Sequence, residues 1–213
     1  MCIRDREGVK YILNGHSFRT EGIMPIGWTY MDGRYINSVQ KMFGHKKLTT
    51  VPNFTLMDYL NYVVIRGIKI VPLLNFFEYN QEKITKTLEQ ELDWVYYGGH
   101  HHESYYTYFF QSYYLPKKFN IDKRKIEYSA LIRSGQMKRE QALEEIWGTP
   151  YPYDEEIVDY AVNKLGLTKE EFAQIMAAPT KTFHDYPTYY PLLRLLRKPL
   201  RLAYRFNLVS ELL

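Results

Sequence analysis

The sequence predicts a mostly helical α/β fragment. Two short apolar segments, residues 9–13 and 68–74, have the Val, Ile and Leu content of strands, and about eight further segments have the periodicity of amphipathic helices. Two strands rarely form a stable sheet alone, and parallel strands normally belong to a larger covered sheet. We therefore expect the C-terminal part of an α/β protein, with a remnant of the sheet domain in residues 1–76 and a helical region with a basic tail in residues 77–213.

The expected helices follow from their caps and stops. Thr55 is a suitable N-cap for a helix that ends before Gly67, and Thr168 with Glu171 has the spacing of a capping box. A Tyr-rich helix should stop before Pro116, because proline lacks the N–H that a helix interior requires. The expected helices cover residues 35–43, 55–66, 82–94, 104–114, 122–133, 138–147, 154–165 and 169–176, followed by a loop over 179–191 and a basic helix from about residue 192 that is interrupted at Pro199.

The composition excludes several classes of protein. The 213 residues include a single cysteine, Cys2, so the chain alone can form neither a disulfide framework nor a zinc site built from cysteines. No apolar run approaches the roughly 20 residues of a membrane-spanning helix, and the charged residues 4–7 stand where a signal peptide would become apolar. The 21 tyrosines are typical of amphipathic side chains at the rim of a core.

Positive charge is concentrated in two zones. Residues 117–139 contain eight basic and two acidic residues, and residues 194–213 contain five basic and one acidic residue. The net charge of the whole chain is only +4, so the rest of the sequence is acidic. The two zones indicate either anionic partners or solvated helix faces.

A polar loop, Asn14-Gly-His-Ser-Phe-Arg-Thr-Glu-Gly22, follows the first expected strand. Ligands of open α/β proteins bind beyond the carboxyl ends of strands, and glycines let the backbone approach a ligand closely. His16, Ser17 and Glu21 would supply acid–base, hydroxyl and ionic groups. A plain turn with a capping serine is the alternative.

The segment Gly98-Gly-His-His-His-Glu-Ser104 has three interpretations. His100 and His102 fall on one side of an extended backbone and, with Glu103, would form a metal site. Glycines before a helix N-terminus would instead favour a bound anion, such as a substrate phosphate. The third interpretation is that the histidines only support the fold.

Basic residues cluster in Leu115-Pro-Lys-Lys-Phe-Asn-Ile-Asp-Lys-Arg-Lys125. Several of them precede or begin a helix, where positive charge opposes the helix dipole. This arrangement is favourable if the cluster faces phosphate groups. Aromatic residues lie mostly outside the cluster, so we expect a small anionic ligand and no nucleic acid.

Several segments together resemble one family, the bacterial N-acetyl sugar amidotransferases, which are asparagine-synthetase-like members of the PP-loop ATP pyrophosphatase group. Tyr97–Ser104 and Ile121–Lys125 are the most specific of the similar segments. The others, within residues 8–187, are Glu21-Gly22, 28–36, 52–54, 94–96, 119–120, 131–136 and 181–187. The resemblance implies the C-terminal part of a PP-loop (adenine nucleotide alpha hydrolase-like) Rossmann-type domain with a helical C-terminal region.

The resemblance also implies a reaction. ATP, with Mg²⁺, would adenylate the N-acetyl oxygen of a sugar or nucleotide sugar and release pyrophosphate. Ammonia from a separate glutaminase subunit would then displace AMP and leave an acetamidino group. Such sugars, pseudaminic acid derivatives among them, enter lipopolysaccharide O-antigens and flagellar glycans, and the expected location is the cytoplasm.

The resemblance implies roles for individual residues, among them Asp122, which would orient the neighbouring cations or help to hold Mg²⁺. The expected catalytic residues are His16, Glu21 and Lys123. The expected nucleotide and phosphate ligands are Asn14, Gly15, Ser17, Lys117, Lys118, Asp122, Arg124 and Lys125. The expected substrate ligands are His100, His101, His102, Glu103, Ser104 and Arg133. For Asp122 the alternative is a helix cap, and for Arg133 a partner of the helix dipole.

The sequence departs from the family in its first residues. It has neither the Gly-rich phosphate loop of the Ser-Gly-Gly-x-Asp-Ser kind nor the N-terminal cysteine pattern. We therefore expect an incomplete C-terminal fragment that neither binds ATP tightly nor turns over alone. The alternative functions are a metal-dependent hydrolase built on His100–His102 and a non-catalytic module that docks through its basic tail.

Overall fold

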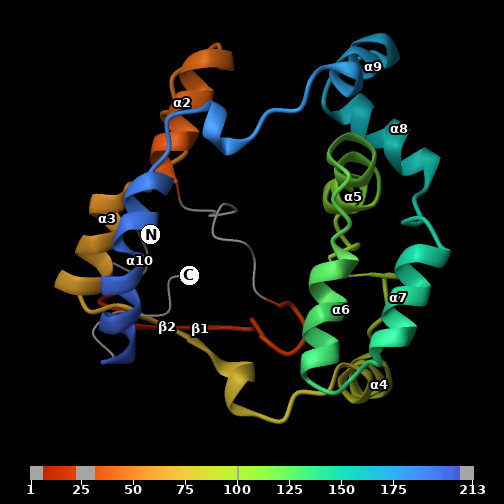
Figure 1. Ribbon diagram of the computed structural model, residues 1–213, viewed down its shortest axis with the longest axis horizontal. Helices are drawn as coiled ribbons and strands as arrows, with labels where there is room; N and C mark the ends of the chain where they lie inside the picture. Colours follow the sequence, from red (N-terminus) through yellow and green to blue (C-terminus); the bar gives the residue numbers. More distant parts are fainter. Residues whose placement is uncertain (1–6, 23–31, 100, 207–213) are drawn as a thin grey trace. The chain divides into compact units, whose positions relative to one another are not determined.

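The computed structural model describes residues 7–22, 32–99 and 101–206 (Figure 1). These residues are mostly helical, with one small sheet. They divide into two compact units. Unit 1 comprises Met1–Gly15, Met24–Leu73 and Lys181–Leu213, and unit 2 comprises His16–Ile23 and Leu74–Thr180.

The sheet of unit 1 consists of two parallel strands, β1 (Tyr11–Asn14) and β2 (Lys69–Pro72), with Tyr11 beside Lys69 and Asn14 beside Pro72. Pro72 ends its strand, as expected for a residue without an N–H to donate. Tyr11 and Leu13 are largely exposed. The parallel pair confirms an α/β character for a mostly helical chain, whereas the wider Rossmann-type sheet stays a prediction.

Unit 1 also contains the helices of the early and last parts of the chain. The capping box of Thr55 and Asp58 is present at the start of α3, and Gly67 adopts a positive φ after the following π-helix, so the expected helix over 55–66 is confirmed. The elements are α2 (Gly33–Phe43), α3 (Leu56–Leu60), the π-helix η2 (Asn61–Ile65), the 3-10 helix η5 (Phe183–Asp185) and α10 (Tyr190–Arg205). None of the described helices combines the length and the apolar character that a membrane crossing requires.

The core of unit 2 is aromatic. Phe109 is buried against Val158, Ala161 and Val162, and the partly buried rings of Tyr113, Tyr114 and Phe172 surround them. This packing accounts for part of the tyrosine content, as expected for amphipathic side chains at the rim of a core. The elements are α4 (Gln81–Leu92), α5 (Tyr105–Phe109), the π-helix η4 (Phe110–Phe119), α6 (Arg124–Arg133), α7 (Arg139–Gly148), α8 (Glu155–Lys164) and α9 (Lys169–Ala177); a 3-10 turn, η3 (Leu73–Phe76), precedes them.

Two expectations about proline were wrong. The Tyr-rich helix does not stop before Pro116 but continues as η4 to Phe119, and α10 continues through Pro199. A proline ring collides with the carbonyl four residues earlier in an α-helix. The wider π-helical turn accommodates Pro116, and π-helical segments are frequent at functional sites. The boundary between residues 76 and 77 stays a prediction, although the chain passes from unit 1 to unit 2 close to it, after Leu73.

The buried carboxylate of Asp32 joins two parts of unit 1. Its Oδ1 accepts a hydrogen bond from the Tyr35 N–H (2.9 Å) and so caps α2. Its Oδ2 accepts from the Thr188 hydroxyl and from the Tyr189 N–H (2.9 Å), immediately before α10. Asp32 therefore fixes the start of α10 against the start of α2.

We expect Asp32→Ala to destabilise the chain by about 2–3 kcal/mol, because a cap is lost and buried donors remain unpaired. Urea unfolding followed by circular dichroism measures this change. The control is Asp159→Ala, which removes an exposed ion pair with Lys169 (3.0 Å) and should cost less than about 1 kcal/mol. Equal losses in both variants would contradict the role of Asp32.

Candidate functional site

The loop His16–Gly22 in unit 2 folds around a single carboxylate. Glu21 Oε1 accepts a hydrogen bond from the Ser17 N–H (3.1 Å), and Glu21 Oε2 lies 2.7 Å from His16 Nδ1. The Ser17 carbonyl accepts from the Glu21 N–H (3.0 Å), and the Ser17 side chain is buried. The expected acid–base pair, His16 and Glu21, is therefore brought together.

This loop packs directly on α6. Gly22 has a positive φ, and a Cβ atom there would lie 2.9 Å from both the carbonyl oxygen and Cγ2 of Ile126. The Ser134 hydroxyl donates to the Arg19 carbonyl (2.9 Å). A side chain at residue 22 would thus push the loop away from α6, so the close packing of loop and helix requires a glycine at this position.

In the described part of the histidine segment, the ring of His102 is buried. His102 packs edge-on against Tyr108, with ring centroids 4.5 Å apart, and its Nε2 forms a hydrogen bond with the Tyr151 hydroxyl (3.4 Å). Burial lowers the pKa of His102, although Glu103 opposes this effect. His101 Nδ1 lies 3.3 Å from Glu103 Oε1, and Ser104 caps α5. His100 lies outside the described residues.

Arg124, which is 9% exposed, holds the start of α6 in place. Its guanidinium forms an ion pair with Asp122 (Nη2–Oδ2 2.7 Å) and donates to the carbonyls of Glu145 (3.3 Å) and Thr149 (3.0 Å). It also lies 5.0 Å from the ring centroid of Tyr151. Asp122 Oδ1 accepts from the Arg124 N–H (2.9 Å), but the N-cap of α6 is Lys123, so Asp122 lies one residue before the cap position that the sequence predicted for it.

Glu127 follows Ile126, on which the His16–Gly22 loop packs, and charges from all three segments act on it. Its Oε1 is buried without a hydrogen-bond partner. Burial is the main cause that raises its pKa, to about 7, and the negative charges of Asp122 and Glu21 add to this effect. The positive charge of Lys123 and the His101 ring oppose it. We call Glu21, His101, Asp122, Lys123 and Glu127 the Glu127 cluster, and its members come from all three segments that the sequence singled out.

Tyrosines complete the surroundings of Glu127. Burial raises the pKa of Tyr96 and, more strongly, that of Tyr151, and in both cases the charge of Glu127 contributes. Burial likewise raises the pKa of Tyr128, whose hydroxyl donates to Glu145 Oε2 (2.7 Å). These phenols are neutral at physiological pH, whereas Glu127, with a pKa of about 7, changes its charge in that range.

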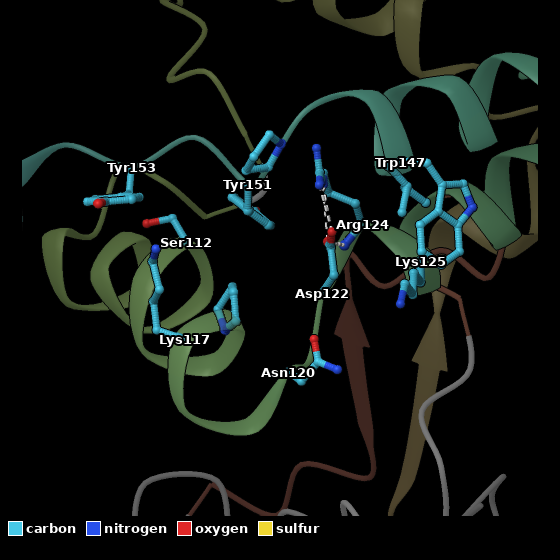
Figure 2. Close-up of a pocket in the computed structure, with 12 residues that line it drawn as sticks. Ser112, Lys117, Asn120, Asp122, Arg124, Lys125, Trp147, Tyr151 and Tyr153 are labelled. Carbon is cyan, nitrogen blue, oxygen red and sulfur yellow. Dashed lines mark hydrogen bonds and ion pairs between the residues drawn. The ribbon is translucent and has the colours of Figure 1, made fainter. Parts of the chain in front are cut away.

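A hollow of about 270 Å³ adjoins the cluster (Figure 2). Asp122 belongs to both, and Tyr151, whose pKa is raised in part by the charge of Glu127, also lines the hollow. In the figure, Lys117 and Tyr153 lie on one side of Asp122, and Lys125 and Trp147 on the other. Lys117 Nζ lies 5.4 Å from the Tyr153 ring centroid, and Lys125 Nζ lies 5.5 Å from the Trp147 ring. The hollow thus offers two ammonium groups beside exposed aromatic faces, which suits an anion attached to a planar or sugar ring.

The remaining expected site residues are not among those that line the hollow. Lys118 Nζ donates to the carbonyls of Ile175 and Ala178 at the end of α9, where a cation complements the helix dipole. Arg133 is exposed in the last turn of α6. Asn14 and Gly15 belong to unit 1. The ligand roles of these residues, like those of all the expected site residues, stay predictions.

Sequence reasoning missed Glu127, Trp147, Tyr151 and Tyr153. A signal existed for Glu127, because it shares an i, i+3, i+7 stripe with the small residues Ala130 and Ser134, and such a stripe faces a core. No local pattern marks the aromatic residues, since they reach the hollow from the end of α7 and the chain that follows. Within the described ranges, no three His, Cys, Asp or Glu side chains are grouped to hold a metal ion.

The pKa of Glu127 predicts how stability depends on pH. The folded chain keeps a proton on Glu127 that the unfolded chain releases above about pH 4.5, so the stabilisation from this proton is lost as the pH rises through about 7. Glu127→Gln should therefore gain about 2 kcal/mol over the parent chain between pH 5 and pH 8. Urea unfolding at several pH values measures the difference. The control is Glu144→Gln on α7. If the free energies of unfolding of the parent chain and of Glu127→Gln changed in parallel with pH, Glu127 would not be a buried carboxylate.

One comparison with known proteins gives a match. Residues 103–199 match the family model described as LPS biosynthesis protein WbpG-like, C-terminal domain. No curated protein and no solved structure matches the chain. The matched region contains the Arg124 contacts, Glu127 and the hollow, whereas the His16–Gly22 loop precedes it. Over residues 103–199 the chain is therefore similar to the C-terminal domain of lipopolysaccharide biosynthesis proteins.

Proposed function

We propose that this chain provides the phosphate- and sugar-binding part of an ATP-dependent amidotransferase that converts the N-acetyl group of a sugar into an acetamidino group. The observation that carries the proposal is the Glu127 cluster, in which three segments that resemble the amidotransferases meet within one unit. The match of residues 103–199 supports a place in lipopolysaccharide biosynthesis.

The hollow is the proposed site of the phosphate groups. Lys117 and Lys125 are the cations beside it, and the Asp122–Arg124 ion pair fixes the wall between them. Bound ATP, which enters with Mg²⁺, supplies the adenylyl group that activates the sugar's carbonyl oxygen. Cations at this position stabilise the negative charge of the departing pyrophosphate. Lys118 and Arg124 support the fold in this proposal, because their donors are bound to carbonyls and to Asp122.

The Glu127 cluster is the proposed site of proton transfer. Replacement of the carbonyl oxygen by ammonia requires the nitrogen to lose a proton. A carboxylate with a pKa of about 7 is half ionised at physiological pH and can accept that proton and pass it on. The hydrogen-bonded His16 and Glu21 lie in the loop that packs on Ile126, the residue before Glu127, and are the proposed path for the proton.

The exposed strands indicate where the rest of the active protein attaches. Parallel strands are normally covered and flanked by further strands, yet Tyr11 and Leu13 are exposed. We propose that β1 and β2 extend a larger sheet that carries the phosphate loop, and that a separate glutaminase supplies ammonia to the cytoplasmic enzyme.

The reaction is tested with the whole natural gene product that contains this chain. It is incubated with ATP, Mg²⁺, an ammonium salt and nucleotide sugars that carry one or two N-acetyl groups, and mass spectrometry follows the acetamidino product, AMP and pyrophosphate. The double variant Lys117→Ala/Lys125→Ala should lose at least about 100-fold in kcat/KM. Lys86→Ala, which removes an exposed cation of α4, is the control and should retain activity.

Two outcomes would contradict the proposal. Failure of the whole gene product to form AMP and an acetamidino sugar from any of these substrates would exclude the reaction. Turnover by the 213-residue chain alone would exclude the proposed larger sheet as the source of the phosphate loop.

A further inference from the structure

The last helix, α10, has two chemically different sides. Its 16 residues include five basic residues and no acidic residue. At 100° per residue the basic positions fall within an arc of about 100°, and the leucines occupy the opposite side. The basic positions are 194, 197, 198, 201 and 205, and the leucine positions are 192, 193, 195, 196, 200 and 202.

Part of the leucine side is open to solvent. Leu195 is 77% exposed, and Leu192, Leu202 and Phe206 are exposed on the same side. Among the described helices and strands, none packs extensively on α10. A single exposed leucine is ordinary, but several on one side of one helix mark an interaction surface. Asp32 holds the start of α10 through Thr188 and Tyr189, so this surface has a fixed point of attachment to unit 1.

The charges indicate what covers this surface. Helices that pair with a copy of themselves normally carry complementary charges beside their apolar seam. Two copies of α10 would instead bring together ten basic groups without a single acidic partner. An anionic lipid surface neutralises these charges and accepts the leucines at the same time, because long basic side chains reach the headgroups while the apolar side enters the interface.

We propose that α10 is a membrane-surface helix that lies in the interface of an anionic lipid layer. Over its described 16 residues, the helix is not long and apolar enough to cross the layer. Its leucines contribute apolar burial, and its basic residues contribute attraction to the anionic headgroups. This inference does not depend on the proposed enzymatic function.

Flotation of the whole chain with lipid vesicles tests the proposal. The vesicles contain phosphatidylcholine alone or with added phosphatidylglycerol. We expect binding only to the anionic vesicles and weaker binding at high salt. Leu195→Gln should weaken this binding about tenfold, because one buried leucine is lost without a change in charge. The matched control is Leu92→Gln at a leucine of α4 that is 70% exposed, and it should bind like the parent chain.

Three results would overturn the proposal. Absence of binding to anionic vesicles at low salt would exclude a lipid surface. Equal binding by Leu195→Gln and the parent chain would show adsorption through charge alone. A dimer in analytical ultracentrifugation that Leu195→Gln dissociates, without vesicle binding, would assign the leucine side to a second copy of the chain. Circular dichroism verifies that both variants fold like the parent.

Discussion

The arrangement of the candidate site depends on the buried guanidinium of Arg124. It forms an ion pair with Asp122 and contacts the ring of Tyr151. It also donates hydrogen bonds to two carbonyl groups, those of Glu145 at the end of α7 and of Thr149 just beyond it. Arginine is suited to this position because its planar group donates in several fixed directions at once. A buried ion pair contributes little net stability when complete but costs much when one partner is removed. Arg124 therefore specifies the geometry of the site more than it stabilises the chain.

The same contacts help to explain the raised pKa of Glu127. They hold Asp122 and Tyr151 beside α6, while the packing of Gly22 on Ile126 brings the loop that carries Glu21 onto the same helix. Two carboxylates and a low-dielectric environment then oppose the ionisation of a third carboxylate, which has an unpaired oxygen. A buried carboxylate of this kind lowers stability, and natural proteins retain one chiefly where activity requires it. This is the physical reason why we assign Glu127, rather than the more conspicuous histidines, to the centre of the site.

Sequence reasoning succeeded where neighbouring residues decide the structure. The caps at Thr55 and Thr168 and the stop at Gly67 depend on contacts within one helical turn, and the two strands follow from two apolar segments, although their parallel pairing does not. It could not separate Lys117 from Lys118: the two are adjacent in the π-helix η4, but Lys117 lines the hollow while Lys118 donates to a carbonyl at the end of α9. It missed Trp147 and Tyr151 because their approach to the hollow depends on how α7 packs on α6. Such tertiary contacts leave no local pattern.

The candidate site requires the loop of Glu21 and the helix of Glu127 to lie together. A double-mutant cycle of Glu21→Gln and Glu127→Gln, measured by urea unfolding, detects this proximity. At pH 8, where the repulsion between the carboxylates is present, we expect the double variant to gain at least about 0.5 kcal/mol less than the sum of the single variants. The coupling should disappear near pH 5, where Glu127 is protonated in the folded chain. Additive effects at both pH values would show that the two carboxylates are not neighbours and would contradict the site.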